Sequence, residues 1–141
     1  MLDYIAYFIY FVIFTYCYYG LNKKLSTKWI FLLYLLVFIA AIYPLKLWFA
    51  YLRPAYGDAF ASHWLKIILM MFASLTLFNW FYGIVNFMVD KQVQFHHTYN
   101  KPNAVGLLKP VLDNAPKIKA YTHFFFYSGG VILIYIYIQK V

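Results

Sequence analysis

The sequence predicts an all-α integral membrane protein with four transmembrane helices, in a single membrane domain that covers residues 1–141. Its residues are 65% hydrophobic and only 11% charged, whereas about 25% of the residues of a soluble domain are charged. Four apolar stretches each approach the roughly 20 residues that are needed to cross about 30 Å of hydrocarbon. The basic residues lie mainly between these stretches, which is typical of membrane topology.

The four predicted spans are, approximately, residues 4–21, 29–52, 66–89 and 120–139. The first is interpreted as a retained span, because no basic region precedes it and no small-residue cleavage site follows at 18–20. In the second, Pro44 is expected to kink or end the helix, and residues 53–58 indicate a turn. Residues 90–119 are predicted to form a long polar loop.

The distribution of basic residues predicts the orientation of the spans. Most follow the first and third spans, namely Lys23, Lys24, Lys28, Lys91, Lys101, Lys109, Lys117 and Lys119, and fewer lie on the other side, namely Lys46, Arg53, Lys66 and Lys140. The positive-inside rule therefore places the basic loops in the cytoplasm or matrix and both termini outside. This topology accounts for the net charge of +8 without nucleic-acid binding, which we do not predict.

A stripe of small and polar residues follows the third span, where they recur every three or four positions: Thr76, Asn79, Gly83, Asn86 and Asp90. At 100° per residue they fall within roughly 80° of one another on a helix. Polar side chains inside a membrane normally face protein or water, and small residues let helices approach closely. The stripe is therefore either a helix-packing seam joined by asparagine hydrogen bonds or one wall of a cofactor pocket.

The sequence offers few groups for catalysis or metal binding. The neighbouring His96 and His97 do not share a helix face, and the chain contains no Glu, so no metal site is predicted. His123 is expected near the inner membrane face, either solvated or in contact with a lipid headgroup or a partner carboxylate. No nucleophile elbow and no phosphate-binding glycine loop occurs. The chain is therefore interpreted as a non-catalytic subunit.

The third span also resembles a known family. Residues 79–90 read NWFYGIVNFMVD, which is similar to the second membrane helix of the large cytochrome b-type membrane anchor of succinate dehydrogenase, respiratory complex II. That family reads H-x-x-x-G-I-R-H-x-x-x-D, so Gly83, Ile84 and Asp90 match in register. The resemblance covers roughly residues 26–139, and the predicted directions of the second to fourth spans agree with it.

The resemblance implies a ubiquinone site but no haem ligand from this chain. The haem-ligating His of the family corresponds to Asn79, and its second His corresponds to Asn86. Asparagine is not a haem ligand, so we expect that this chain does not ligate haem b. The Ser and Arg of the family's quinone site lie at the level of residues 26–28, where this chain has Ser26 and Lys28 but no Arg. Ser26, Lys28 and Asp90 are therefore the expected quinone-binding residues.

The resulting hypothesis is a membrane-anchor subunit in the respiratory chain and tricarboxylic acid cycle. Its expected partners are an iron–sulfur subunit at the 90–119 loop, a second anchor subunit and lipids. We expect it in the mitochondrial inner membrane, with the bacterial inner membrane as the alternative. Two other functions remain open, an accessory structural subunit of another respiratory complex and a self-assembling membrane pore.

Overall fold

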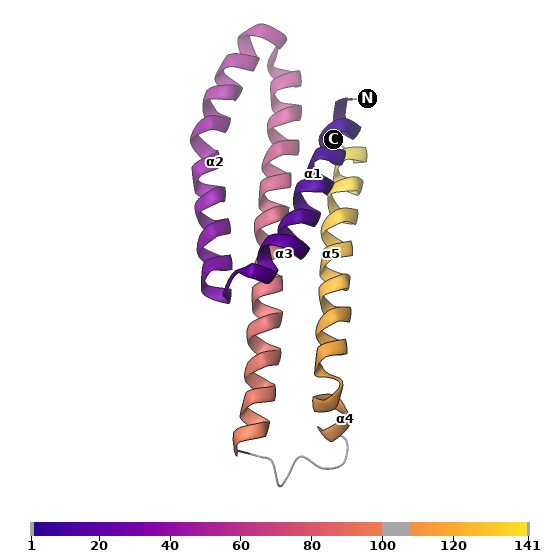
Figure 1. The fold of residues 1–141 in the computed structure, drawn as a ribbon. Coiled ribbons are helices and arrows are strands. Elements are labelled where there is room, and N and C mark those ends of the chain that lie inside the picture. Colours follow the sequence, from indigo (N-terminus) through magenta and orange to yellow (C-terminus); the bar gives the residue numbers. More distant parts are fainter. Residues whose placement is uncertain (1, 100–107, 141) are drawn as a thin grey trace.

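The computed structural model describes residues 2–99 and 108–140, and every regular element within them is helical (Figure 1). The elements are α1 (Leu2–Thr15), which continues through a π-helix η1 (Tyr16–Leu21) and a 3-10 helix η2 (Asn22–Lys24), then α2 (Thr27–Tyr56), α3 (Asp58–Tyr99), α4 (Leu108–Asp113) and α5 (Ala115–Lys140). Within the described residues, four helices are long and apolar enough to cross a membrane: Leu2–Lys24, Thr27–Tyr56, Asp58–Tyr99 and Ala115–Lys140. The predicted all-α membrane fold is confirmed to this extent.

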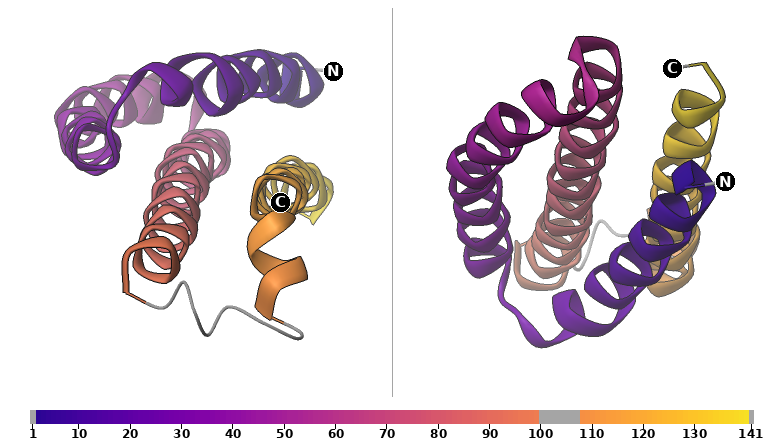
Figure 2. Two further views of the ribbon diagram at one scale, coloured as in Figure 1. Left: turned by 60° about the horizontal axis from the view of Figure 1, so that its bottom comes forward. Right: turned by 90° about the horizontal axis from the view of Figure 1, so that it is seen from above.

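The helix α3 is the centre of the bundle. It lies between α2 and α5, and α1 crosses it obliquely, as the two views of Figure 2 show. The Tyr10 hydroxyl lies 2.8 Å from Ser74 Oγ and so joins α1 to α3. Gln139 Nε2 donates to the Tyr4 hydroxyl at 2.9 Å, which places the described N-terminal and C-terminal ends at one end of the bundle (Figure 1).

Aromatic side chains fill much of the core between these helices. Phe14 has no exposed surface and stacks on Tyr10 and Tyr127, with ring centroids 5.4 and 5.5 Å apart. A side chain at Gly130 would meet Phe14, because an added Cβ would lie 2.7 Å from its Cζ atom. Gly130 therefore allows α5 to approach α1 closely enough for this ring to be enclosed.

The structure narrows two expectations about α2 and its end, that Pro44 kinks or ends the helix and that residues 53–58 form a turn. The helix does not end at Pro44 but continues through Pro44 and Pro54 to Tyr56. Prolines are tolerated in apolar helices where neighbouring groups and local adjustment satisfy the freed backbone groups. The chain turns at Gly57, whose φ of +88° suits a residue without a Cβ atom. The predicted turn at 53–58 is thus confined to its last residues.

The segment predicted as a loop over 90–119 is also corrected in part. Residues 90–99 continue α3, residues 108–113 form α4 and residues 115–119 begin α5, while residues 100–107 lie outside the described residues. No proline or glycine interrupts 90–99, and Lys119 pairs with Asp90 across the two helices at 2.9 Å. The 42 residues of α3 extend over about 63 Å, about twice the thickness of a hydrocarbon core of about 30 Å.

Candidate functional site

A buried hydrogen-bond network joins the end of the first span to α2 and α3. Asn22 Nδ2 donates to Asn79 Oδ1 at 2.6 Å, and the Tyr34 hydroxyl donates to Asn22 Oδ1 at 3.0 Å. Asn79 Nδ2 donates to the backbone carbonyl of Leu75 at 2.6 Å. Asn22, Asn79 and Tyr34 are at most 2% exposed. The network is therefore closed to solvent, and its polar groups bind one another rather than a ligand.

The other members of the stripe on α3 contact two different neighbours. Thr76 Oγ1 lies 3.5 Å from the backbone carbonyl of Tyr34 on α2. Gly83 faces α2 as well, since an added Cβ would lie 3.4 Å from Phe31. Asn86 instead faces α5, where its Oδ1 lies 3.0 Å from His123 Nε2. The stripe thus forms a packing seam along most of its length, and its last asparagine reaches a cavity.

That cavity, here called the His123 cavity, has a volume of about 390 Å³ and lies between the end of the first span, α3 and α5. It is lined by Asn22, Lys23, Leu25, Tyr82, Asn86, Pro116, Lys119, Ala120 and His123. The His123 ring stacks on Tyr82 with centroids 4.1 Å apart. Because an amide oxygen can only accept, the contact with Asn86 Oδ1 places a proton on His123 Nε2. His123 Nδ1 has no partner among the described residues.

The three residues expected to bind quinone do not share one cavity. Ser26 and Lys28 line a cavity of about 600 Å³ between the start of α2 and α3, together with Thr27, Phe31 and Phe87. Asp90 faces α5 instead, where Lys119 Nζ donates to both of its carboxylate oxygens at 2.9 and 3.1 Å. Asp90 therefore does not lie with Ser26 and Lys28.

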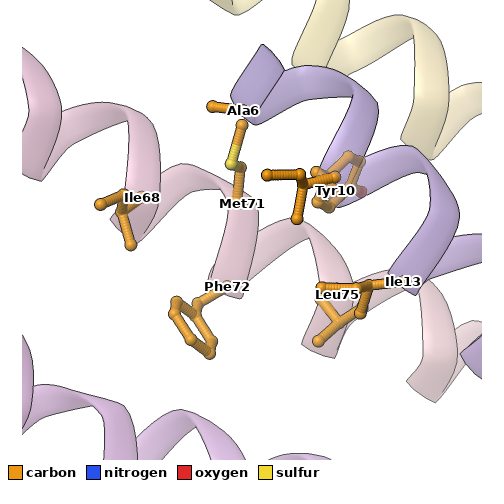
Figure 3. Close-up of a pocket in the computed structure, with 8 residues that line it drawn as sticks. Ala6, Tyr10, Ile13, Ile68, Met71, Phe72 and Leu75 are labelled. Atoms are coloured by element: carbon orange, nitrogen blue, oxygen red, sulfur yellow. The ribbon is translucent and has the colours of Figure 1, made fainter. Parts of the chain in front are cut away.

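A third cavity, of about 230 Å³, lies between α1 and α3 and is lined almost wholly by apolar side chains (Figure 3). In Figure 3, Ala6, Tyr10 and Ile13 approach it from α1, and Ile68, Met71, Phe72 and Leu75 approach it from α3. Tyr10 carries the one polar group among these residues, and that hydroxyl bonds Ser74. The cavity therefore offers no side chain for acid–base chemistry or metal binding.

Metal binding finds no geometric support in residues 2–99 and 108–140. No group of three His, Cys, Asp or Glu side chains in these ranges could hold a metal ion. Asn79, at the position of the family's haem ligand, donates to Leu75 and accepts from Asn22. Its side chain is thus occupied by hydrogen bonds within the bundle.

Two residues gain importance that the sequence did not indicate. Asn22 is 1% exposed although it directly precedes two lysines, a position that reads as a polar loop. Tyr18, which near the end of an apolar stretch suggests a membrane interface, is fully buried against Tyr82 and Tyr127. The sequence signal for Asn22 was its position as a polar residue directly after a tyrosine-rich span. Its partner, Asn79 on α3, lies 57 positions away, so the sequence did not indicate their contact.

The chain matches no protein-family model, and neither the curated proteins nor the solved structures contain a significant match to it.

Proposed function

We propose that this chain is a non-catalytic membrane-anchor subunit of a respiratory complex, with succinate dehydrogenase as the specific candidate, and that it helps to form a ubiquinone site. The observation that carries the proposal is the cavity at the start of α2, where Ser26 and Lys28 lie beside two phenylalanines. The proposed location is the mitochondrial inner membrane, with both termini on the outer side and the basic segments in the matrix.

The chemistry of this cavity suits a quinone headgroup. Such a ring is flat and apolar on its faces and carries two carbonyl oxygens that accept hydrogen bonds. Phe31 and Phe87 offer aromatic surfaces for stacking, and the Ser26 hydroxyl and Lys28 ammonium can donate to a carbonyl oxygen. Phe87 is 54% exposed, so a second anchor subunit would complete the wall. The quinone accepts the electrons, and this chain binds and orients it.

The projecting end of α3, with α4 and the start of α5, is the proposed docking surface for the iron–sulfur subunit. It carries Lys91, Lys109, Lys117 and Lys119. It also exposes apolar side chains beyond the expected hydrocarbon core, since Phe95 is 52%, Tyr99 75% and Val111 53% exposed. Exposed aromatic side chains within a basic surface favour a soluble protein partner that is acidic and partly apolar.

Purification from the native membrane in mild detergent tests the anchor assignment. We expect mass spectrometry to identify a flavoprotein and an iron–sulfur protein in the purified complex. The substitution Phe95→Asp, on the proposed docking surface, is expected to reduce the recovery of both proteins, because it places a charge within an apolar contact. Isolation of the unsubstituted chain without these partners would contradict the assignment.

The quinone site has its own test in the assembled complex. We expect Phe87→Ala to lower the affinity for a soluble ubiquinone analogue about tenfold, because it removes an aromatic contact. Ser26→Ala is expected to weaken binding in the same direction through the loss of a hydrogen bond. Phe125→Ala is the matched control, since Phe125 is likewise an exposed phenylalanine of a membrane helix but does not line the cavity. Equal effects of Phe87→Ala and Phe125→Ala would overturn the site.

The closed network around Asn79 favours a second candidate function, that of an accessory structural subunit in another respiratory complex. A chain with this role needs a rigid bundle but no ligand, and the network supplies rigidity alone. If Asn79→Leu weakens assembly while Phe87→Ala leaves quinone affinity unchanged, this second function is preferred. A self-assembling pore gains no such support, because Asn22 and Asn79 bond each other inside the chain.

A further inference from the structure

We propose that the His123 cavity binds the phosphate group of an anionic phospholipid. This inference concerns a different cavity from the proposed quinone site and does not depend on it. The charges of the lining residues favour an anion. Lys23 and Lys119 both line the cavity, and no acidic side chain does. Lys119 is neutralised in part by Asp90, whereas Lys23 has no ion pair among the described residues.

Among the uncharged lining residues, Asn86 offers a donor to the oxygens of a phosphate group. Its Oδ1 accepts from His123 Nε2, which leaves its Nδ2 group to donate. The Tyr82 ring and Leu25 form its apolar part, against which a glycerol backbone can lie. Its volume of about 390 Å³ falls within the range of roughly 300–1,000 Å³ that is usual for small-molecule sites.

The position of the cavity along the helices favours a lipid as the source of the phosphate. Lys23 lies just after the apolar stretch of the first span, and Lys119 lies just before the apolar stretch of α5. Both positions are at the depth of lipid headgroups. Nearer the middle of these helices, exposed apolar side chains such as Tyr16 (65%) and Phe124 (62%) offer surface for acyl chains. Basic pockets between transmembrane helices on the inner side characteristically hold anionic headgroups.

The proposal is tested by lipid binding to the full chain, purified in mild detergent together with any bound subunits. Native mass spectrometry is used to compare phosphatidylglycerol with phosphatidylcholine of the same acyl chains. We expect phosphatidylglycerol to bind more tightly, and Lys23→Gln to weaken it about fivefold, the effect of removing one lysine from an anionic lipid site. Asp90→Asn is expected to have the opposite effect, because it leaves the Lys119 charge unpaired.

Lys24→Gln is the matched control, because it removes the same charge from the neighbouring residue, which does not line the cavity. We expect it to leave phosphatidylglycerol affinity unchanged, and thermal unfolding checks that each variant is folded. Equal binding of the two lipids, or equal loss in Lys24→Gln and Lys23→Gln, would overturn the proposal. Competition by millimolar inorganic phosphate decides the source: resistance supports the lipid, and displacement overturns the lipid assignment in favour of the soluble ion.

Discussion

Replacing Asn79 by Leu is expected to lower the free energy of unfolding by about 1–3 kcal/mol, which is the cost of leaving a buried polar group without its partner. The substitution removes the acceptor of the 2.6 Å bond from Asn22, and Asn22 is only 1% exposed. Polar pairs between membrane helices are worth about 0.6 kcal/mol on average. The larger value is expected here because the Asn22 amide stays enclosed, with Tyr34 still donating to its other end.

This prediction can be checked by thermal or denaturant unfolding of the purified chain in detergent. The double substitution Asn22→Leu/Asn79→Leu completes a mutant cycle, and its loss of stability should be smaller than the sum of the two single losses. Additive losses would mean that the two amides do not depend on each other. A stability of Asn79→Leu equal to that of the unsubstituted chain would show that the network does not hold the first span against α3.

Gly130→Ala is expected to destabilise the bundle by about 1–3 kcal/mol, the usual cost of overpacking a core, although alanine is the better helix former by about 1 kcal/mol. The new Cβ atom would lie 2.7 and 2.9 Å from two Phe14 ring atoms and 3.1 Å from a ring atom of Phe78. Phe14 cannot move aside freely, because it is fully buried between Tyr10 and Tyr127. The strain is therefore expected to exceed the gain in helix propensity.

Gly129→Ala provides the neighbouring control. Its Cβ atom would approach only Phe78, at 3.3 Å, so a much smaller loss or a small gain in unfolding temperature is expected. A second substitution, Phe14→Leu, should restore part of the stability of Gly130→Ala because it shortens the obstructing side chain. If Gly129→Ala is as harmful as Gly130→Ala, or if Phe14→Leu adds to the damage, the steric explanation is wrong.

Hydrophobicity alone was enough to identify the four membrane helices, because each apolar stretch is long and the bilayer requires such a length. The limits of the helices were harder to predict. Pro44 suggests a kink or an end in the second span, and the polar composition of 90–99 suggests a loop. Both segments are helical. Local sequence preference is a weak guide in such segments, because packing against neighbouring helices can override it.

The stripe on α3 was visible in the sequence because helical periodicity places its members on one face. The neighbour that each member contacts depends on the arrangement of the other helices. Periodicity therefore could not show that Asn79 bonds Asn22 in a closed network, whereas Asn86 lies beside His123. For the same reason, periodicity could not show that Ser26 and Lys28 line one cavity while Asp90 pairs with Lys119. Local pattern and charge thus establish a basic, four-helix membrane protein, whereas the cavities arise from packing between residues far apart in the chain.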